Sequence, residues 1–150
     1  MANVARLALG ICAVVGLAGC AGDPAGSLTG NTGIAADDFP PIGPTSSFVG
    51  ELVEADNGCL MLRTGSGVDS WLVWPEGSTR DEKDPTTVHL GGGREVRPGD
   101  ALEVTGQAIG FGDLPDGDNQ DSMWGAAARY CVPADAPEPK IIRAGSITQA

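Results

Sequence analysis

The feature that most restricts the fold is a series of short strand-like segments, each ended by a turn rich in glycine. The clearest segment, Ala101–Ile109, alternates apolar and polar side chains. Leu102 and Val104 would face a core, while Glu103 and Thr105 would face solvent. A period of two is typical of a half-buried β-strand. This stretch therefore indicates that the domain contains a β-sheet with one face buried.

Similar segments recur along the chain at a spacing of roughly ten residues. The turn signal Asp56-Asn57-Gly58 joins the first two of them as a hairpin. Residues 124–132 fit either a short helix, because of three consecutive alanines, or a strand, because of Tyr130 and Val132. The other expected strands are residues 48–54, 59–63, 71–74, 87–90 and 140–143.

This number and spacing of segments predict an all-β domain, either a small five- or six-stranded barrel or a sandwich. The stretch from Val96 to Gly106 resembles the turn-and-strand of many OB-type and related small barrels. In those barrels a Gly-Asp turn starts a core strand and a later glycine lets the strand bend. The resemblance favours an OB-like barrel over the sandwich.

An uncharged and mostly apolar run occupies residues 7–19, after a start whose only basic side chain is Arg6. As a helix the run would be about 20 Å long, which is too short for a hydrocarbon core of about 30 Å. A basic start, a short apolar middle and an end of small residues are typical of a secretory signal. We therefore expect residues 1–19 to be a signal peptide.

Four residues close this apolar run: Leu17, Ala18, Gly19 and Cys20. They resemble the lipobox of bacterial lipoproteins, which implies cleavage before Cys20 and a diacylglycerol thioether on its sulfur. Two acyl chains suffice for stable attachment, so the resemblance implies a lipid anchor on the extracytoplasmic side of the bacterial cell membrane or outer membrane. The alternatives are a secreted protein in which Cys20 forms a disulfide and an uncleaved membrane helix.

The expected anchor determines which of the four cysteines can form a disulfide bond. Cys12 would leave with the signal peptide and Cys20 would carry lipid, which leaves Cys59 and Cys131. An even pair of thiols in an oxidising compartment predicts one disulfide bond. The alternative is that both thiols stay free.

The remaining chain divides into three parts. Residues 20–47 are rich in Gly, Pro, Ser, Thr and Asp without a visible period, and we expect a disordered, flexible tether. Residues 48–143 would form one all-β domain and residues 144–150 a C-terminal tail. The length allows one domain at most.

The charge of the chain restricts its partners. Its formal net charge is −11, and cleavage of the signal would remove one more positive charge, that of Arg6. Such a chain is repelled by phosphates and by anionic lipid headgroups. Nucleic acid is therefore excluded as an expected partner, and acyl chains rather than basic side chains would hold the protein to the membrane.

One acidic loop, Asp113–Asp121, is a candidate cation site. Asp116, Asp118 and Asp121 offer oxygen ligands at short intervals, as calcium loops do. The loop departs from the EF-hand pattern, because Asp121 stands where glycine is needed and Ala127 where glutamate is needed. The alternatives are a calcium- or small-ligand-binding loop and a solvated acidic loop without a ligand.

The single histidine, His89, is the only candidate for imidazole catalysis. A hydrolase would need a nucleophile and an orienting carboxylate beside it, and the chain contains no Gly-x-Ser-x-Gly elbow. We therefore expect no enzyme and no cofactor, with an envelope hydrolase as the lesser alternative.

Trp71 and Trp74 are candidates for partner binding. In a strand the two rings would face opposite sides, so one is expected in the core and the other either exposed or under a loop. An exposed tryptophan can anchor a peptide, a sugar or a protein. The sequence thus predicts a non-enzymatic binding or scaffolding module of the cell envelope, with an envelope protein or small ligand as partner.

Overall fold

Five strands form one sheet that closes on itself in the computed structural model, which describes residues 42–150. The expected signal peptide, the lipobox-like residues with Cys20 and most of the expected tether lie outside the described residues. The five strands are β1 (Ser46–Glu54), β2 (Leu60–Thr64), β3 (Asp69–Val73), β7 (Ala101–Ile109) and β8 (Ile141–Gln149).

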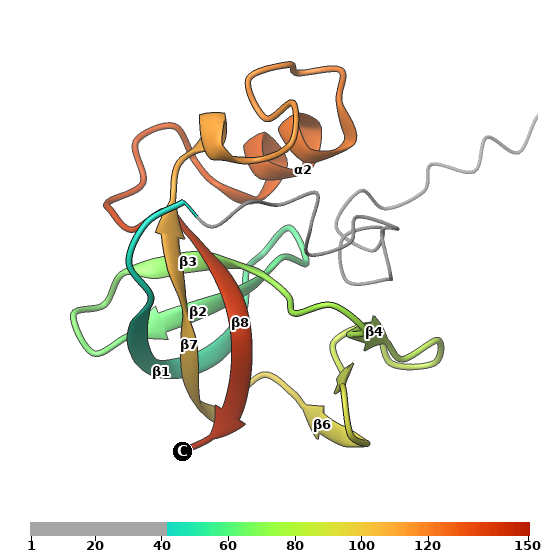
Figure 1. Cartoon of the computed structure of the whole chain (residues 1–150). Helices are drawn as coiled ribbons and strands as arrows, with labels where there is room; N and C mark the ends of the chain where they lie inside the picture. The colour runs from blue at the N-terminus through green and yellow to red at the C-terminus, as the bar shows by residue number, and fades with distance from the viewer. Residues whose placement is uncertain (1–41) are drawn as a thin grey trace, which may run out of the picture.

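The strands follow the order β1-β2-β3-β8-β7, and β7 also pairs with β1 to complete a barrel (Figure 1). Four of the five pairings are antiparallel. The exception is β3 with β8, which run parallel, with Trp71 beside Ile141. The expectation of an all-β domain is confirmed in part, because the described residues are mostly in strands but also form an α-helix.

The hairpin β1–β2 and the strand β7 lie where the sequence pattern places them. The amide of Gly58 donates to the carbonyl oxygen of Ala55 at 2.8 Å, and Gly58 has a φ of 81°. This left-handed backbone favours glycine, which explains the position of Gly58 in the turn. In contrast, β8 is longer than the expected strand and runs to Gln149, so residues 144–149 form a strand where a tail was expected.

A bulge interrupts the long β7–β8 pairing between Thr105 and Gly106. The two backbones lie close together there, because a Cβ atom on Gly106 would overlap the carbonyl oxygen of Arg143. Glycine is therefore required at this position by the close approach of two backbones. The bulge lets β7 and β8 bend around the barrel.

The barrel interior is one of two apolar cores. It contains leucines from β1, β2, β3 and β7, and it is covered on one side by a small sheet in the order β4-β5-β6. These short strands are β4 (Thr79–Arg80), β5 (Val88–Leu90) and β6 (Arg94–Val96). The side chains that the small sheet adds to this core are Val88, Leu90 and Val96.

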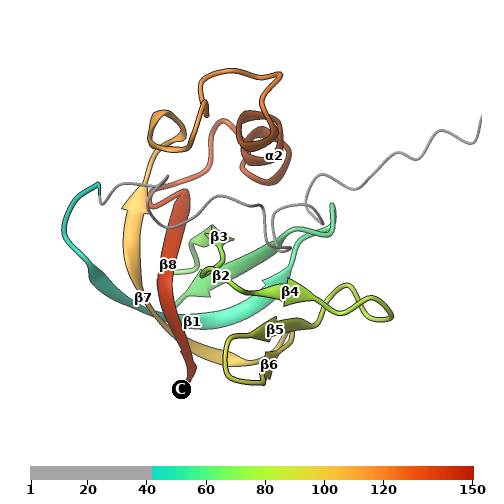
Figure 2. The ribbon, with the colours of Figure 1, turned by 45° about the vertical axis from the view of Figure 1, so that its right-hand side comes forward.

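The second core lies on the other face of β2 and β3, where Met61 and Trp71 pack against α2 (Met123–Cys131). Figure 2 shows α2 at the end of the barrel opposite the C-terminus. The connection from β7 to α2 begins with the single turn η2 (Phe111–Asp113). No helix in the described part of the chain is long and apolar enough to cross a membrane.

The helix α2 decides between the two interpretations of residues 124–132. Ser122 caps its first turn by accepting a hydrogen bond from the amide of Gly125 at 2.9 Å. The three alanines at 126–128 favour helix, and two of them, Ala127 and Ala128, are buried against the barrel. Capping and burial together outweigh the strand preference of Tyr130 and Val132.

Candidate functional site

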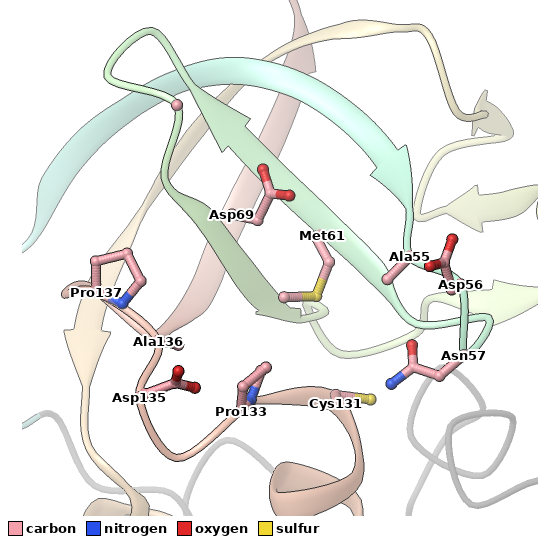
Figure 3. Close-up of a pocket in the computed structure, with 11 residues that line it drawn as sticks. Ala55, Asp56, Asn57, Met61, Asp69, Cys131, Pro133, Asp135, Ala136 and Pro137 are labelled. Atoms are coloured by element: carbon pink, nitrogen blue, oxygen red, sulfur yellow. The ribbon is translucent and has the colours of Figure 1, made fainter.

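A pocket of about 560 Å³ lies on the outer face of β2 and β3, next to the end of α2 (Figure 3). Three segments line it: residues 55–57 after β1, the β2–β3 hairpin and residues 131–137 after α2. The volume lies in the range of roughly 300–1,000 Å³ that is typical of ligand sites. Its apolar lining residues are Ala55, Met61, Cys131, Pro133, Ala136 and Pro137.

A disulfide bond joins two of the segments that line the pocket. Cys59 and Cys131 are bonded, with 5.6 Å between their Cα atoms, which confirms the predicted bond and makes the alternative of free thiols wrong. The bond fixes the start of β2 to the end of α2. It therefore ties the loop before β2 to the loop after α2.

Two hydrogen bonds support the same junction. The side-chain amide of Asn57 donates to the carbonyl oxygen of Tyr130 at 2.7 Å, and the Tyr130 hydroxyl donates to the carbonyl oxygen of Asn57 at 3.0 Å. The Asn57 side chain also accepts from the amide of Cys59 at 3.2 Å. The pocket is thus bordered by loops that are held in place before any ligand arrives.

Three carboxylates surround the pocket, and no Lys, Arg or His lines it. Asp69 accepts two hydrogen bonds from Arg63, from Nε at 2.8 Å and from Nη2 at 2.7 Å. This hydrogen bonding, and then the Coulomb attraction of Asp69, raise the pKa of Arg63 above its usual value. Asp56 and Asp135 are exposed and have no hydrogen bond or ion pair within residues 42–150.

His89 lies elsewhere, on the small sheet, between two carboxylates. Its Nε2 is 3.0 Å from Asp81 Oδ2 and its Nδ1 is 3.3 Å from Glu95 Oε1. Glu95 is also 3.1 Å from Nη2 of Arg97. Within the described residues, no serine or cysteine is hydrogen-bonded to the ring, so the nucleophile that an imidazole hydrolase needs is not in place there.

The contact with His89 lowers the pKa of Asp81. Its hydrogen bond with His89, and then those from the backbone amides of Lys83 and Asp84, lower the pKa of its carboxyl. The two amides donate to Asp81 Oδ1 at 2.8 and 2.9 Å. Asp81 therefore fastens the turn after β4 and connects it to β5, which is a structural role that the sequence did not indicate.

The acidic loop is folded against α2 by its backbone. Arg129 donates to the carbonyl oxygens of Gly117 at 2.9 Å and Asp118 at 3.0 Å. The side chains of Asp116, Asp118 and Asp121 are exposed. Across residues 42–150, no three acidic, histidine or cysteine side chains are gathered as metal ligands, so the structure does not bring these carboxylates together as a calcium site.

Trp71 and Trp74 are both buried, one in each core. Trp71 packs under α2 and Trp74 packs in the barrel interior. The two rings point to opposite sides, as expected. Both sides are covered, because α2 packs over Trp71 and the small sheet packs over the core that contains Trp74. Neither ring is thus available as the exposed anchor that the sequence suggested.

Sequence reasoning missed most of the pocket residues. The sequence marks Asp56 and Asn57 as turn residues and Cys131 as a disulfide partner, but it does not mark Met61, Pro133 or Asp135. No local pattern marks these residues as neighbours. The available signal was the disulfide itself, since it brings the residues around Cys59 beside those around Cys131.

Comparison of the chain with protein-family models, with curated protein sequences and with solved structures finds no match. The site must therefore be interpreted from its own geometry.

Proposed function

We propose that this chain is a lipid-anchored, non-enzymatic binding module on the extracytoplasmic side of a bacterial cell envelope, and that its barrel is OB-like. The single observation that carries the binding role is the pocket on β2 and β3, with its apolar lining and its fixed loops. Concave, mostly apolar and largely preformed sites with a few polar groups are typical of ligand binding.

The position of the pocket supports an OB-like binding face. OB-type barrels bind ligands on strands 2 and 3, between the loop after strand 1 and the loop between strands 4 and 5. Counted along the chain, the barrel strands here are β1, β2, β3, β7 and β8. The pocket is lined by residues 55–57, which follow the first strand, and by residues 131–137, which lie between the fourth and the fifth.

The lipid anchor is supported by the sequence and by the cysteine pairing. Leu17, Ala18, Gly19 and Cys20 have the residue types of the lipobox. The Cys59–Cys131 bond leaves Cys20 without these partners, and disulfides persist in extracytoplasmic compartments. An anchor of this kind would hold the barrel, and with it the pocket, close to the membrane surface.

The anchor is tested by replacing its cysteine. Cys20→Ala should abolish labelling of the protein by an alkyne analogue of palmitate in growing bacteria, because the acceptor sulfur is lost. The control is Cys12→Ala, which should be labelled like the unaltered protein. Equal label in the Cys20→Ala variant would refute the lipoprotein proposal.

The pocket is tested by photocrosslinking in native host cells. A photoreactive residue at position 137, on the pocket wall, should give discrete adducts of higher mass, and one at position 76, exposed in the turn after β3, should not. Ala136→Trp, which fills the pocket, should remove the adducts because it excludes the ligand.

The matched control for this test is Ala134→Trp. Ala134 is exposed in the same loop but does not line the pocket, so its replacement should leave the adducts intact. Adducts that are the same from positions 137 and 76, or that survive Ala136→Trp while the melting temperature is unchanged, would contradict a binding role for the pocket.

A further inference from the structure

We infer that the pocket on β2 and β3 binds an extended, basic segment of a partner protein, in which two positively charged side chains flank an apolar one. This inference rests on the proposed binding function and adds the chemical class of the ligand.

The charges around the pocket favour a cationic ligand. Asp56, Asp69 and Asp135 are among the eleven lining residues, and the lining includes no basic side chain. Asp69 already holds Arg63 in a two-pronged hydrogen bond. Lys140 contacts the loop after α2 and donates through Nζ to the carbonyl oxygen of Ala134 at 3.0 Å. Asp56 and Asp135 are therefore the carboxylates available to a ligand.

These two carboxylates belong to opposite walls of the pocket. Asp56 projects from the loop after β1, and Asp135 projects from the loop after α2 (Figure 3). The side chain of Met61 lies between the walls, on β2. A ligand that pairs with both carboxylates must carry two separated positive charges. The group between these charges would lie over Met61, which forms the floor of the pocket.

The floor favours an apolar group at the centre of the ligand. Met61, Pro133 and Ala136 present a thioether and aliphatic carbons, and methionine adapts to varied apolar partners. A peptide in the extended conformation places side chains i, i+2 and i+4 on one face. Lysines at the two outer positions and leucine at the central one therefore match the two walls and the floor.

Polyamines share the two charges but lack the apolar group, so the floor distinguishes them from a peptide. Burying one leucine side chain contributes about 1.5–3 kcal/mol, which corresponds to a gain in affinity of roughly tenfold or more. The segment of a partner protein is accordingly the occupant that uses the whole pocket.

The test uses the full chain, purified in detergent micelles from a host that exports it, and labelled peptides followed by fluorescence anisotropy at low salt. The peptide Lys-Ala-Leu-Ala-Lys, with capped ends, should bind. Its analogue with serine in place of leucine should bind about tenfold more weakly, and Glu-Ala-Leu-Ala-Glu should not bind. Spermidine should not displace the leucine peptide at equal concentration.

Variants locate the binding on the protein. Asp56→Asn and Asp135→Asn should each weaken binding by about two- to fivefold, the range of an exposed ion pair, and the double variant should weaken it further. The matched control is Glu76→Gln, which removes an equal charge from an exposed position outside the pocket and should leave the affinity unchanged. Circular dichroism confirms that each variant is folded.

Three results would overturn the inference: no binding of the leucine peptide, equal binding of the serine peptide or spermidine, or equal loss of affinity in Glu76→Gln. None of these results removes the proposed function. If crosslinked adducts at position 137 persist while the basic peptide fails, the pocket binds a ligand of another class. If the adducts also fail, the binding proposal itself is wrong.

Discussion

Replacing Cys59 and Cys131 together by alanine is expected to lower the free energy of unfolding by about 4 kcal/mol. The bond spans a sequence separation of 72 residues, and a crosslink that closes a loop of this length removes much of the entropy of the unfolded chain. Alanine keeps both buried positions apolar. The measurement is urea unfolding of the full chain in detergent, followed by tryptophan fluorescence.

The unaltered protein treated with a reductant provides the control, because it loses the same bond without a change in sequence. Its unfolding midpoint should fall to that of the double variant. A double variant with the midpoint of the oxidised protein would show that the bond does not stabilise the fold. Since Cys131 lines the pocket, binding of the basic peptide should weaken in the same variant.

The second large effect is expected at Gly106 on β7, next to the bulge in the β7–β8 pairing. Gly106→Ala should lower the free energy of unfolding by about 2–3 kcal/mol, because the added Cβ atom overlaps the carbonyl oxygen of Arg143 on β8 and forces two backbones apart. The register of eight residue pairs along β7 and β8 depends on this approach. Thermal unfolding followed by circular dichroism measures the loss.

Gly145→Ala is the matched control for this prediction. Gly145 is the residue of β8 that the bulge leaves without a partner on β7. It is exposed, and an added Cβ atom would be 3.4 Å from the carbonyl oxygen of Thr105. Its substitution should change stability by less than about 0.5 kcal/mol. If the two alanine variants unfold at the same temperature, close backbone packing does not explain Gly106.

The parts of the fold that could be predicted are those with a local signal. Strand β7 has one buried and one exposed face, so its side chains alternate as the period requires. The β1–β2 hairpin is marked by a turn whose glycine has a positive φ. The disulfide is predicted from the cysteine count on the expectation that Cys12 leaves with a signal peptide and Cys20 carries lipid, and the structure shows the Cys59–Cys131 bond.

The parts that could not be predicted depend on distant partners. Trp71 and Trp74 are both buried because separate elements cover the two faces of β3, and neither element is visible in the sequence around them. The second half of β8 contains Gly145 and Ser146, both exposed, and it is a strand because β7 pairs with it. Strands β4 and β6 are too short to show a period.

The pocket was the least predictable feature, because its residues come from three segments that are far apart in the sequence. Met61 and Asp69 belong to one hairpin, whereas Pro133 and Asp135 follow a helix. Only closure of the barrel and the disulfide bring these segments together. Composition and charge indicated an acidic protein but not where two free carboxylates would lie.

The parallel pairing of β3 with β8 has a consequence for the order in which the molecule folds. Trp71 and Ile141 are neighbours across this pair, and the chain between them must be ordered, or looped out, before they can meet. Loop closure over such a length is entropically costly and slow. The Cys59–Cys131 bond already encloses most of that chain. Its formation in an unfolded molecule would therefore shorten the loop that must close before β3 and β8 can pair. We expect oxidation of the two thiols to speed the pairing of β3 with β8 during folding.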